Sequence, residues 1–208
     1  MAEPVIRPAT AADRSAILAI RYAEPEPEIL TICGSADRAR RVGALLVGYG
    51  VEIRTERTTV LEVEGRAVAL MEVWLEGDGP RLGAWNVVRI LGRGLLIGGP
   101  GLIRRYRRHA NLRERVDTPR PSQSLYIAHL NTHPENRGQG YGGKLLAHAE
   151  AMAKLAKLPQ LALDVYTTNP ARHLYERHGF RTTSEKTDPE FERAAGVPGY
   201  AAMVKKLR

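Results

Sequence analysis

A glycine-rich segment lies at residues 137–143, where the chain reads Arg-Gly-Gln-Gly-Tyr-Gly-Gly. It follows an apolar stretch with strand character at 125–130 and precedes a stretch of helical periodicity that runs to about 157. A helix N-terminus carries unpaired N–H groups and a partial positive charge, and glycines let a ligand approach that backbone closely. This strand–loop–helix unit therefore predicts a phosphate site. Lys144, in the first helical turn, would add positive charge.

Two common phosphate-binding motifs match this loop only in part. Gly138, with four residues before Gly143-Lys144, has the spacing of a P-loop, but Leu145 replaces the Ser/Thr hydroxyl that would bind magnesium. The pattern Gly138-x-Gly140-x-x-Gly143 formally matches a dinucleotide fingerprint. However, the loop comes late in the chain and no repeated series of strand–helix–strand units surrounds it, so the dinucleotide interpretation is the weaker one.

A second motif lies about 33 residues further on, at 171–180, with the sequence Ala-Arg-His-Leu-Tyr-Glu-Arg-His-Gly-Phe. This segment, the loop, and the strand exit at 132–134 (Thr-His-Pro) together resemble the GNAT superfamily of N-acetyltransferases. Arg137, Gly140 and Gly142 match the specified positions of that family's Arg/Gln-x-x-Gly-x-Gly/Ala loop. The resemblance is strong from about 124 to 182 and extends to 5–75, whereas 77–123 lies outside the family's common core.

The resemblance implies that the chain binds acetyl-coenzyme A as co-substrate and transfers its acetyl group to a primary amine in a ternary complex. A backbone N–H near Leu130 would stabilise the tetrahedral oxyanion, and Tyr175 would protonate the departing thiolate. Asn169 is equally well explained as a helix N-cap, in which case Thr168 takes the ligand position. The residues implied to contact the cofactor are Leu130, Asn131, Thr132, Arg137, Gly138, Gln139, Gly140, Tyr141, Gly142, Gly143, Lys144, Asn169 and Tyr175.

The general base is not identified by a motif. Members of the family often place a carboxylate or imidazole where this chain has Tyr126, so a dedicated base is not expected at that position. Glu72, on the strand at 67–74, is the first candidate. His129 is chemically suitable, but strand alternation places it on the face opposite to Tyr126 and Ala128 unless a β-bulge intervenes.

The remaining periodicity predicts the elements that position these residues. We expect an extended segment near 5–7, helices at about 11–22 and 35–48, and an antiparallel hairpin at 59–64 and 67–74. A helical insertion spans about 77–123 and is interrupted at 98–101 (Gly-Gly-Pro-Gly). The cofactor-binding core at about 124–182 then leads to strands at 180–184 and 200–204. The prediction is one domain over 1–208 with an α/β fold of the GNAT type, whose mixed, mostly antiparallel sheet is splayed between its central strands.

Composition limits the classes of partner. With 43% hydrophobic residues, no apolar run long enough for a membrane span and one cysteine, Cys33, the chain reads as a cytoplasmic protein without a disulfide. No zinc-finger spacing occurs and no metal is expected. The net charge of +8 includes the arginines at 104–108, so a nucleic-acid-binding protein is one alternative, although charge alone supports it. A non-catalytic acyl-CoA sensor is the other. The acceptor is a small molecule or peptide amine, and the insertion would shape its site or form a homodimer contact.

Overall fold

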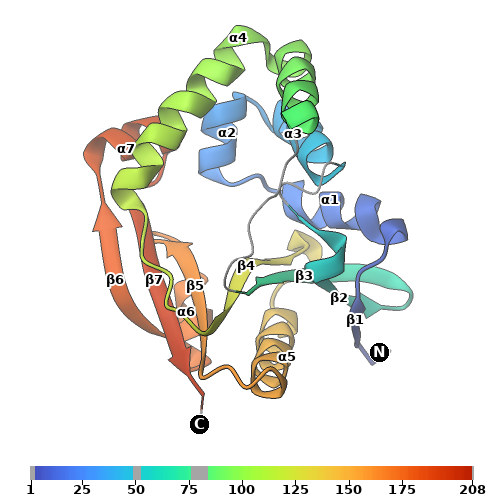
Figure 1. The fold of residues 1–208 in the computed structure, drawn as a ribbon. Coiled ribbons are helices and arrows are strands. Elements are labelled where there is room, and N and C mark those ends of the chain that lie inside the picture. The colour runs from blue at the N-terminus through green and yellow to red at the C-terminus, as the bar shows by residue number, and fades with distance from the viewer. Residues whose placement is uncertain (1–2, 49–52, 76–83, 208) are drawn as a thin grey trace.

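The computed structural model describes residues 3–48, 53–75 and 84–207, with side chains in the last range described from residue 88 onward. Its strands form one seven-stranded sheet in the order β1-β2-β3-β4-β5-β7-β6 (Figure 1). The strands are β1 (Val5–Pro8), β2 (Thr58–Val63), β3 (Arg66–Trp74), β4 (Ser124–Thr132), β5 (Gln160–Tyr166), β6 (Arg181–Thr187) and β7 (Gly199–Lys206). All neighbouring strands are antiparallel except β4 and β5, which confirms the mixed sheet that the sequence predicts.

The central pair of strands separates along its length. β4 and β5 pair only from Ser124 opposite Gln160 to Ile127 opposite Leu163, although β4 continues to Thr132 and β5 to Tyr166. β5 pairs with β7 over its whole length, and β4 pairs with β3 beyond the point of separation. The sheet is therefore splayed between its two central strands, as expected.

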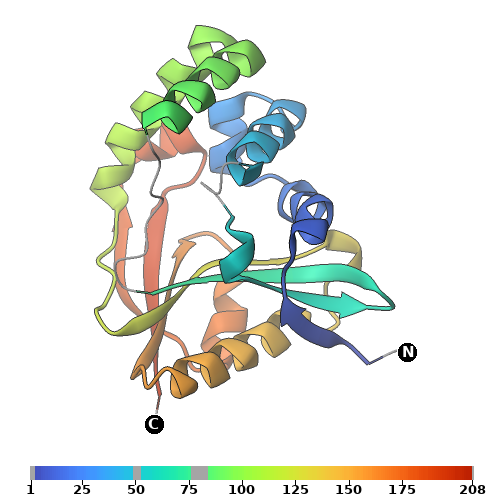
Figure 2. The ribbon, with the colours of Figure 1, turned by 45° about the vertical axis from the view of Figure 1, so that its right-hand side comes forward.

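Helices cover both faces of the sheet (Figure 2). They are α1 (Arg14–Tyr22), α2 (Pro27–Cys33), α3 (Ala36–Gly48), α4 (Ala84–Val116), α5 (Tyr141–Leu155), α6 (Arg172–Arg177) and α7 (Pro189–Ala195), with 3-10 turns at Ala11–Asp13, Thr55–Arg57 and Pro134–Asn136. Leu61 and Met71 pack in the cluster that includes α5, whereas their neighbours Val60 and Leu70 pack in the cluster with α1. Because β2 and β3 are buried on both faces, their sequences are apolar without clean alternation.

The predicted insertion forms α4, which consists of two helical segments. Gly99 has φ 65° and ψ −174°, and Pro100 follows it, so the helix breaks where the sequence predicts an interruption. The segment after the break packs against α2 and α7, and Figure 1 shows the two segments meeting at the end farthest from the sheet. The start of the predicted insertion, up to residue 83, lies outside the described residues.

Two short helices were not predicted. α2 begins at Pro27, between the helices predicted at 11–22 and 35–48, because proline fits the first turn of a helix as well as it breaks one. α7 begins after Asp188, whose side chain accepts hydrogen bonds from Glu190 N and Phe191 N at 2.8 Å. The Asp-Pro-Glu sequence was a readable N-cap signal. No helix in the described ranges is long and apolar enough to span a membrane.

Candidate active site

A β-bulge shapes the strand that faces the open gap. Glu72 of β3 pairs with His129 while Val73 pairs with Ile127, so β4 carries one extra residue, Ala128. Strand alternation alone would place His129 on the face opposite to Tyr126, and a bulge at this point removes that restriction. As a result, Ala128 and His129 line the same cavity as Tyr126.

The backbone of β4 beyond the bulge presents polar groups to the gap. His133 N donates to Val68 O at 2.9 Å, so the N–H of His133 points toward β3. N–H and C=O groups alternate in direction along a strand, so those of Leu130 and Thr132 point toward the side that β5 has left. The predicted oxyanion donor, the N–H of Leu130, thus faces the opening between the two strands.

A cavity of about 580 Å³ lies at this opening and contains most of the predicted cofactor residues. Of these predicted residues, Leu130, Asn131, Thr132, Arg137, Gly138, Gly140, Tyr141, Gly142, Gly143, Asn169 and Tyr175 line it. Gly138 and Gly140 have φ of +78°, in the left-handed region that only glycine adopts without strain. Lys144 N donates to Gly140 O at 3.1 Å, so the amides of residues 141–143 precede the first helical hydrogen bond and are available to an anion.

Two predicted cofactor residues do not line this cavity. Gln139 instead accepts a hydrogen bond from the Tyr141 hydroxyl at 2.7 Å, and the Lys144 side chain is exposed. Arg137 lines the cavity but also pairs with Glu24 at 2.7 Å. Arg177, which the sequence did not single out, is a further cation in the lining.

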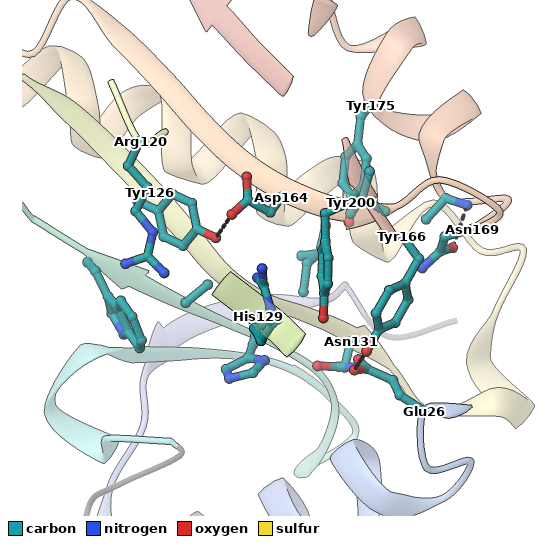
Figure 3. A pocket seen from close by; sticks show the side chains of 16 residues that line it. Glu26, Arg120, Tyr126, His129, Asn131, Asp164, Tyr166, Asn169, Tyr175 and Tyr200 are labelled. Atoms are coloured by element: carbon teal, nitrogen blue, oxygen red, sulfur yellow. Dashed lines mark hydrogen bonds between the residues drawn. The ribbon is translucent and has the colours of Figure 1, made fainter. Parts of the chain in front are cut away.

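A second cavity of about 320 Å³ adjoins the first on the other side of the gap (Figure 3). Its walls come from β3, β4, β5 and β7, from the C-terminal part of α4 and from the segment that follows α4. Six residues line both cavities: Glu26, Leu130, Asn131, Asn169, Ala171 and Tyr175. The two cavities therefore meet at the splayed end of the central strands.

Tyr175 lies at this junction. Its side chain projects from α6, is 8% exposed and packs edge-on against Phe180, with ring centroids 6.0 Å apart. Burial raises the pKa of Tyr175 to about 12, and the negative charge of Glu26 adds to the effect. The hydroxyl is consequently protonated at every pH at which an enzyme normally works.

Asn169 also lies at the junction, and Thr168 is exposed outside both linings. The N-cap residue of α6 is Ala171, two positions later than the sequence predicts. Asn169 Oδ1 nevertheless accepts a hydrogen bond from Ala171 N at 2.9 Å, which forms a turn before the helix. A turn of this kind and a true N-cap have the same sequence signature.

Glu72 is fully buried and does not line either cavity. Its Oε1 accepts a hydrogen bond from Arg54 N at 3.0 Å, and its Oε2 lies 3.8 Å from His129 Nε2. His129 does line the smaller cavity. The two candidates for the general base are therefore neighbours, with the imidazole between the carboxylate and the cavity.

A group of buried tyrosines and carboxylates lies beside the junction, and the sequence did not predict it. The Tyr166 hydroxyl lies 2.7 Å from Glu26 Oε2 and 2.8 Å from Glu28 Oε2, and Tyr200 also donates to Glu28. Burial and the nearby carboxylates raise the pKa of both tyrosines. In the smaller cavity, Asp164 accepts hydrogen bonds from Tyr126 at 3.0 Å and Thr118 at 2.7 Å. Polar residues within the apolar strand at 160–166 were the available signal, because buried polar groups need partners.

The described residues contain no group of three His, Cys, Asp or Glu side chains placed to hold a metal ion. Positive charge in both linings comes from arginine side chains: Arg21, Arg137 and Arg177 in the larger cavity, and Arg113 and Arg120 in the smaller one.

Comparisons with known proteins agree with this geometry. Residues 101–182 match the family model described as the acetyltransferase (GNAT) domain. A solved acetyltransferase is 21% identical, with a TM-score of 0.58 over 98% of this chain and all of the other. The PaiA N-acetyltransferase from Thermoplasma acidophilum, solved with coenzyme A, is 14% identical with a TM-score of 0.52 over 99% of both chains. The C-terminal condensation domain of Ebony, in complex with beta-alanyl-dopamine, is 10% identical with a TM-score of 0.64 over the whole of both chains.

No curated protein sequence matches the chain. At these identities the solved structures establish the fold, and the family model covers the loop, the helix with Tyr175 and every junction residue except Glu26. The resemblance that rests on the motifs at 137–143 and 171–180 is thereby confirmed: residues 101–182 match the GNAT acetyltransferase domain model, and the chain has the fold of solved acetyltransferases.

Proposed function

We propose that the protein transfers an acetyl group from acetyl-coenzyme A to a primary amine by direct attack in a ternary complex. The observation that carries this proposal is the meeting of two cavities at Tyr175. One is walled by the glycine loop and the free end of β4, and the other is lined by aromatic and charged side chains. A thioester and an amine bound in these cavities would face each other at their junction.

The residues at the junction suit each step of the transfer. The amides of residues 141–143 hold the pyrophosphate, and the N–H of Leu130 stabilises the oxyanion that forms when the amine attacks the thioester carbon. As the C–N bond forms and the C–S bond breaks, Tyr175 gives its proton to the departing sulfur. A phenol that is protonated throughout the working pH range is suited to this role.

The amine must lose a proton before or during attack. In this proposal His129 accepts it, because its imidazole lines the acceptor cavity and a base must reach the reacting group. Glu72 acts through His129 rather than on the acceptor: its buried carboxylate lies 3.8 Å from Nε2, where it orients the imidazole toward the cavity.

The experiment measures cofactor binding and turnover separately. Calorimetry with acetyl-coenzyme A should show binding to the wild type and about tenfold weaker binding to Arg177→Ala, which loses a cation from the cavity. Arg181→Ala is the matched control, because Arg181 is exposed on β6 outside both cavities. Absence of binding heat for the wild type would refute the proposal.

Turnover is followed as thiol release with a panel of amines. Tyr175→Phe should lower kcat by about 100-fold or more while leaving cofactor affinity nearly unchanged, because it removes only the proton donor. An unchanged rate would remove Tyr175 from the mechanism. Binding of acetyl-coenzyme A without transfer to any amine would favour the alternative function, a non-catalytic acyl-CoA sensor.

A further inference from the structure

The acceptor cavity has two chemically different ends. Glu26 stands at the end shared with the cofactor cavity, and its side chain is 36% exposed. Arg120 stands at the other end, where its guanidinium lies 4.3 Å from the Tyr126 ring centroid and 5.2 Å from that of Trp74. Figure 3 shows Arg120 and Tyr126 on one side of the cavity and Glu26 and Asn131 on the other. The cavity thus separates a negative end near the reaction centre from a positive end away from it.

The other charged groups in the lining have partners, and so has Glu26, whose Oε1 pairs with Arg21 at 3.0 Å and whose Oε2 accepts a hydrogen bond from Tyr166 at 2.7 Å. Asp164 accepts hydrogen bonds from Thr118 and Tyr126. Arg113 pairs with Asp117 at 3.1 Å and covers the Tyr200 ring at 3.7 Å. Arg120 contacts aromatic faces and makes no ion pair with a carboxylate in the described ranges. It is therefore the cation in this lining best able to bind an anionic group from a ligand.

Two polar atoms of the lining lack a hydrogen-bond partner within the described part of the chain. They are Asn131 Oδ1, an acceptor at the junction, and Trp74 Nε1, a donor in the side chain beside Arg120. A buried polar atom without a partner costs free energy, and such atoms in a binding cavity mark where a ligand supplies the missing group. Asn131 Oδ1 suits an N–H donor, whereas Trp74 Nε1 suits an oxygen acceptor.

These observations agree on the polarity of the ligand. We propose that the acceptor is a small amine with an anionic group, a carboxylate or a phosphate, at the opposite end from its nitrogen. Glu26 and Asn131 hold the amine at the junction, and Arg120 with Trp74 binds the anionic group. The cavity of about 320 Å³ suits a molecule of amino-acid size. This inference rests on the proposed acetyl transfer and specifies its substrate class.

The test compares matched acceptors that differ only in the anionic group. The pairs are β-alanine and ethylamine, 4-aminobutanoate and propylamine, and 5-aminopentanoate and butylamine; O-phosphoethanolamine and ethanolamine test a phosphate in place of a carboxylate. For at least one pair, kcat/KM of the wild type should be at least about tenfold higher for the anionic member. A larger kcat/KM ratio in the carboxylate pairs or in the phosphate pair identifies which anion the site prefers.

The variant Arg120→Met removes the charge but keeps an apolar side chain against the two aromatic rings. It should lower kcat/KM for the acceptors that carry an anionic group by about tenfold or more. The kcat/KM for the matched amines without that group should stay within about threefold of the wild-type value. Arg104→Met, an exposed arginine of α4 outside this lining, is the control and should change neither value.

The outcomes separate this inference from the proposed function. The inference is overturned if the member without the anionic group is acetylated as fast or faster in every pair. It is also overturned if Arg120→Met leaves the preference for the anionic group unchanged. Either result leaves the proposed acetyl transfer intact. If no acceptor is acetylated, thermal stabilisation of the coenzyme A complex by each acceptor is measured instead. Stabilisation by the anionic members that is lost in Arg120→Met supports the site, and its absence overturns it.

Discussion

Glu28 holds four elements together beside the acceptor cavity, and Glu28→Gln should destabilise the fold measurably. The side chain, 8% exposed, projects from α2. Its Oε2 accepts hydrogen bonds from Tyr166 on β5 and Tyr200 on β7, and its Oε1 contacts His109 Nε2 on α4. Gln keeps the shape and one acceptor oxygen, but its NH₂ group faces a site built for a negative charge.

The expected decrease in the free energy of unfolding follows from the environment of this carboxylate. Removing one partner from a buried charged pair typically costs about 3–5 kcal/mol, and the oxygen that Gln retains places the expectation near about 3 kcal/mol. For a chain of this length that corresponds to a fall in Tm of about 6–12 °C. Glu135→Gln is the matched control: its side chain is 86% exposed, so the change should stay within about 0.5 kcal/mol.

The charge on Glu28 also sets how the stability difference between wild type and Glu28→Gln depends on pH. Burial alone would raise the pKa of Glu28, but hydrogen bonds from His109, Tyr200 and Tyr166 outweigh it and hold the pKa below its ordinary value of 4.5. A carboxyl whose pKa is lowered in the folded state stabilises the protein above the unfolded-state pKa and loses that contribution as pH falls through the folded-state pKa. The difference between wild type and Glu28→Gln should therefore be full at pH 7 and shrink below about pH 4.5.

Urea unfolding of the wild type and both variants at pH 7, 5.5, 4.5 and 4 measures these differences. A Glu28→Gln variant within about 0.5 kcal/mol of the wild type at pH 7 would refute the reasoning. So would a difference that grows as the pH falls, because it would show that the buried carboxyl is protonated in the folded state at neutral pH.

Two further predictions concern catalysis and packing. Because burial raises the pKa of Tyr175 to about 12, kcat should show no descending limb between pH 7 and 10, and a pH–rate profile with such a limb that disappears in Tyr175→Phe would contradict the assigned acid. Gly43→Ala should destabilise the protein by about 1–3 kcal/mol because the new Cβ would overlap the Tyr22 ring. Gly92→Ala, which has open space around it, should stabilise α4 by about 0.5–1 kcal/mol. Equal effects of the two substitutions in thermal unfolding would show that the packing at Gly43 is not as described.

The glycine loop of the larger cavity was predictable from the sequence because it is one local segment. The glycines at 138–143 follow a strand and begin a helix, so their geometry is set by neighbours in the chain. The position of His129 was harder. Its direction depends on the extra residue at Ala128, and a bulge has no signature in the strand sequence itself.

The acceptor side could not be read in the same way because its residues come from distant segments. The lining combines Glu26 at the start of α2, Arg120 in the segment after α4, and Asp164 on β5. These residues line one cavity only after their elements have packed together. Long-range contacts of this kind leave no spacing pattern. Their trace is weaker: a charged residue such as Asp164 within an apolar strand, which indicates that some partner exists without saying which one.

This difference in origin separates cofactor binding from acceptor choice. The part of the cofactor cavity proposed to hold the pyrophosphate is formed by backbone groups of the glycine loop, although side chains from 20–26 and 169–177 complete the lining. The acceptor cavity is walled by side chains that Glu28, His109 and the tyrosines fix in place through buried hydrogen bonds. A change at Arg120 or Trp74 alters the ligand end of that wall without touching the glycine loop, whereas a change at Glu28 disturbs the elements that carry the wall. If the protein has the proposed function, its acceptor specificity can therefore change independently of acetyl-coenzyme A binding, provided that the buried cluster is preserved.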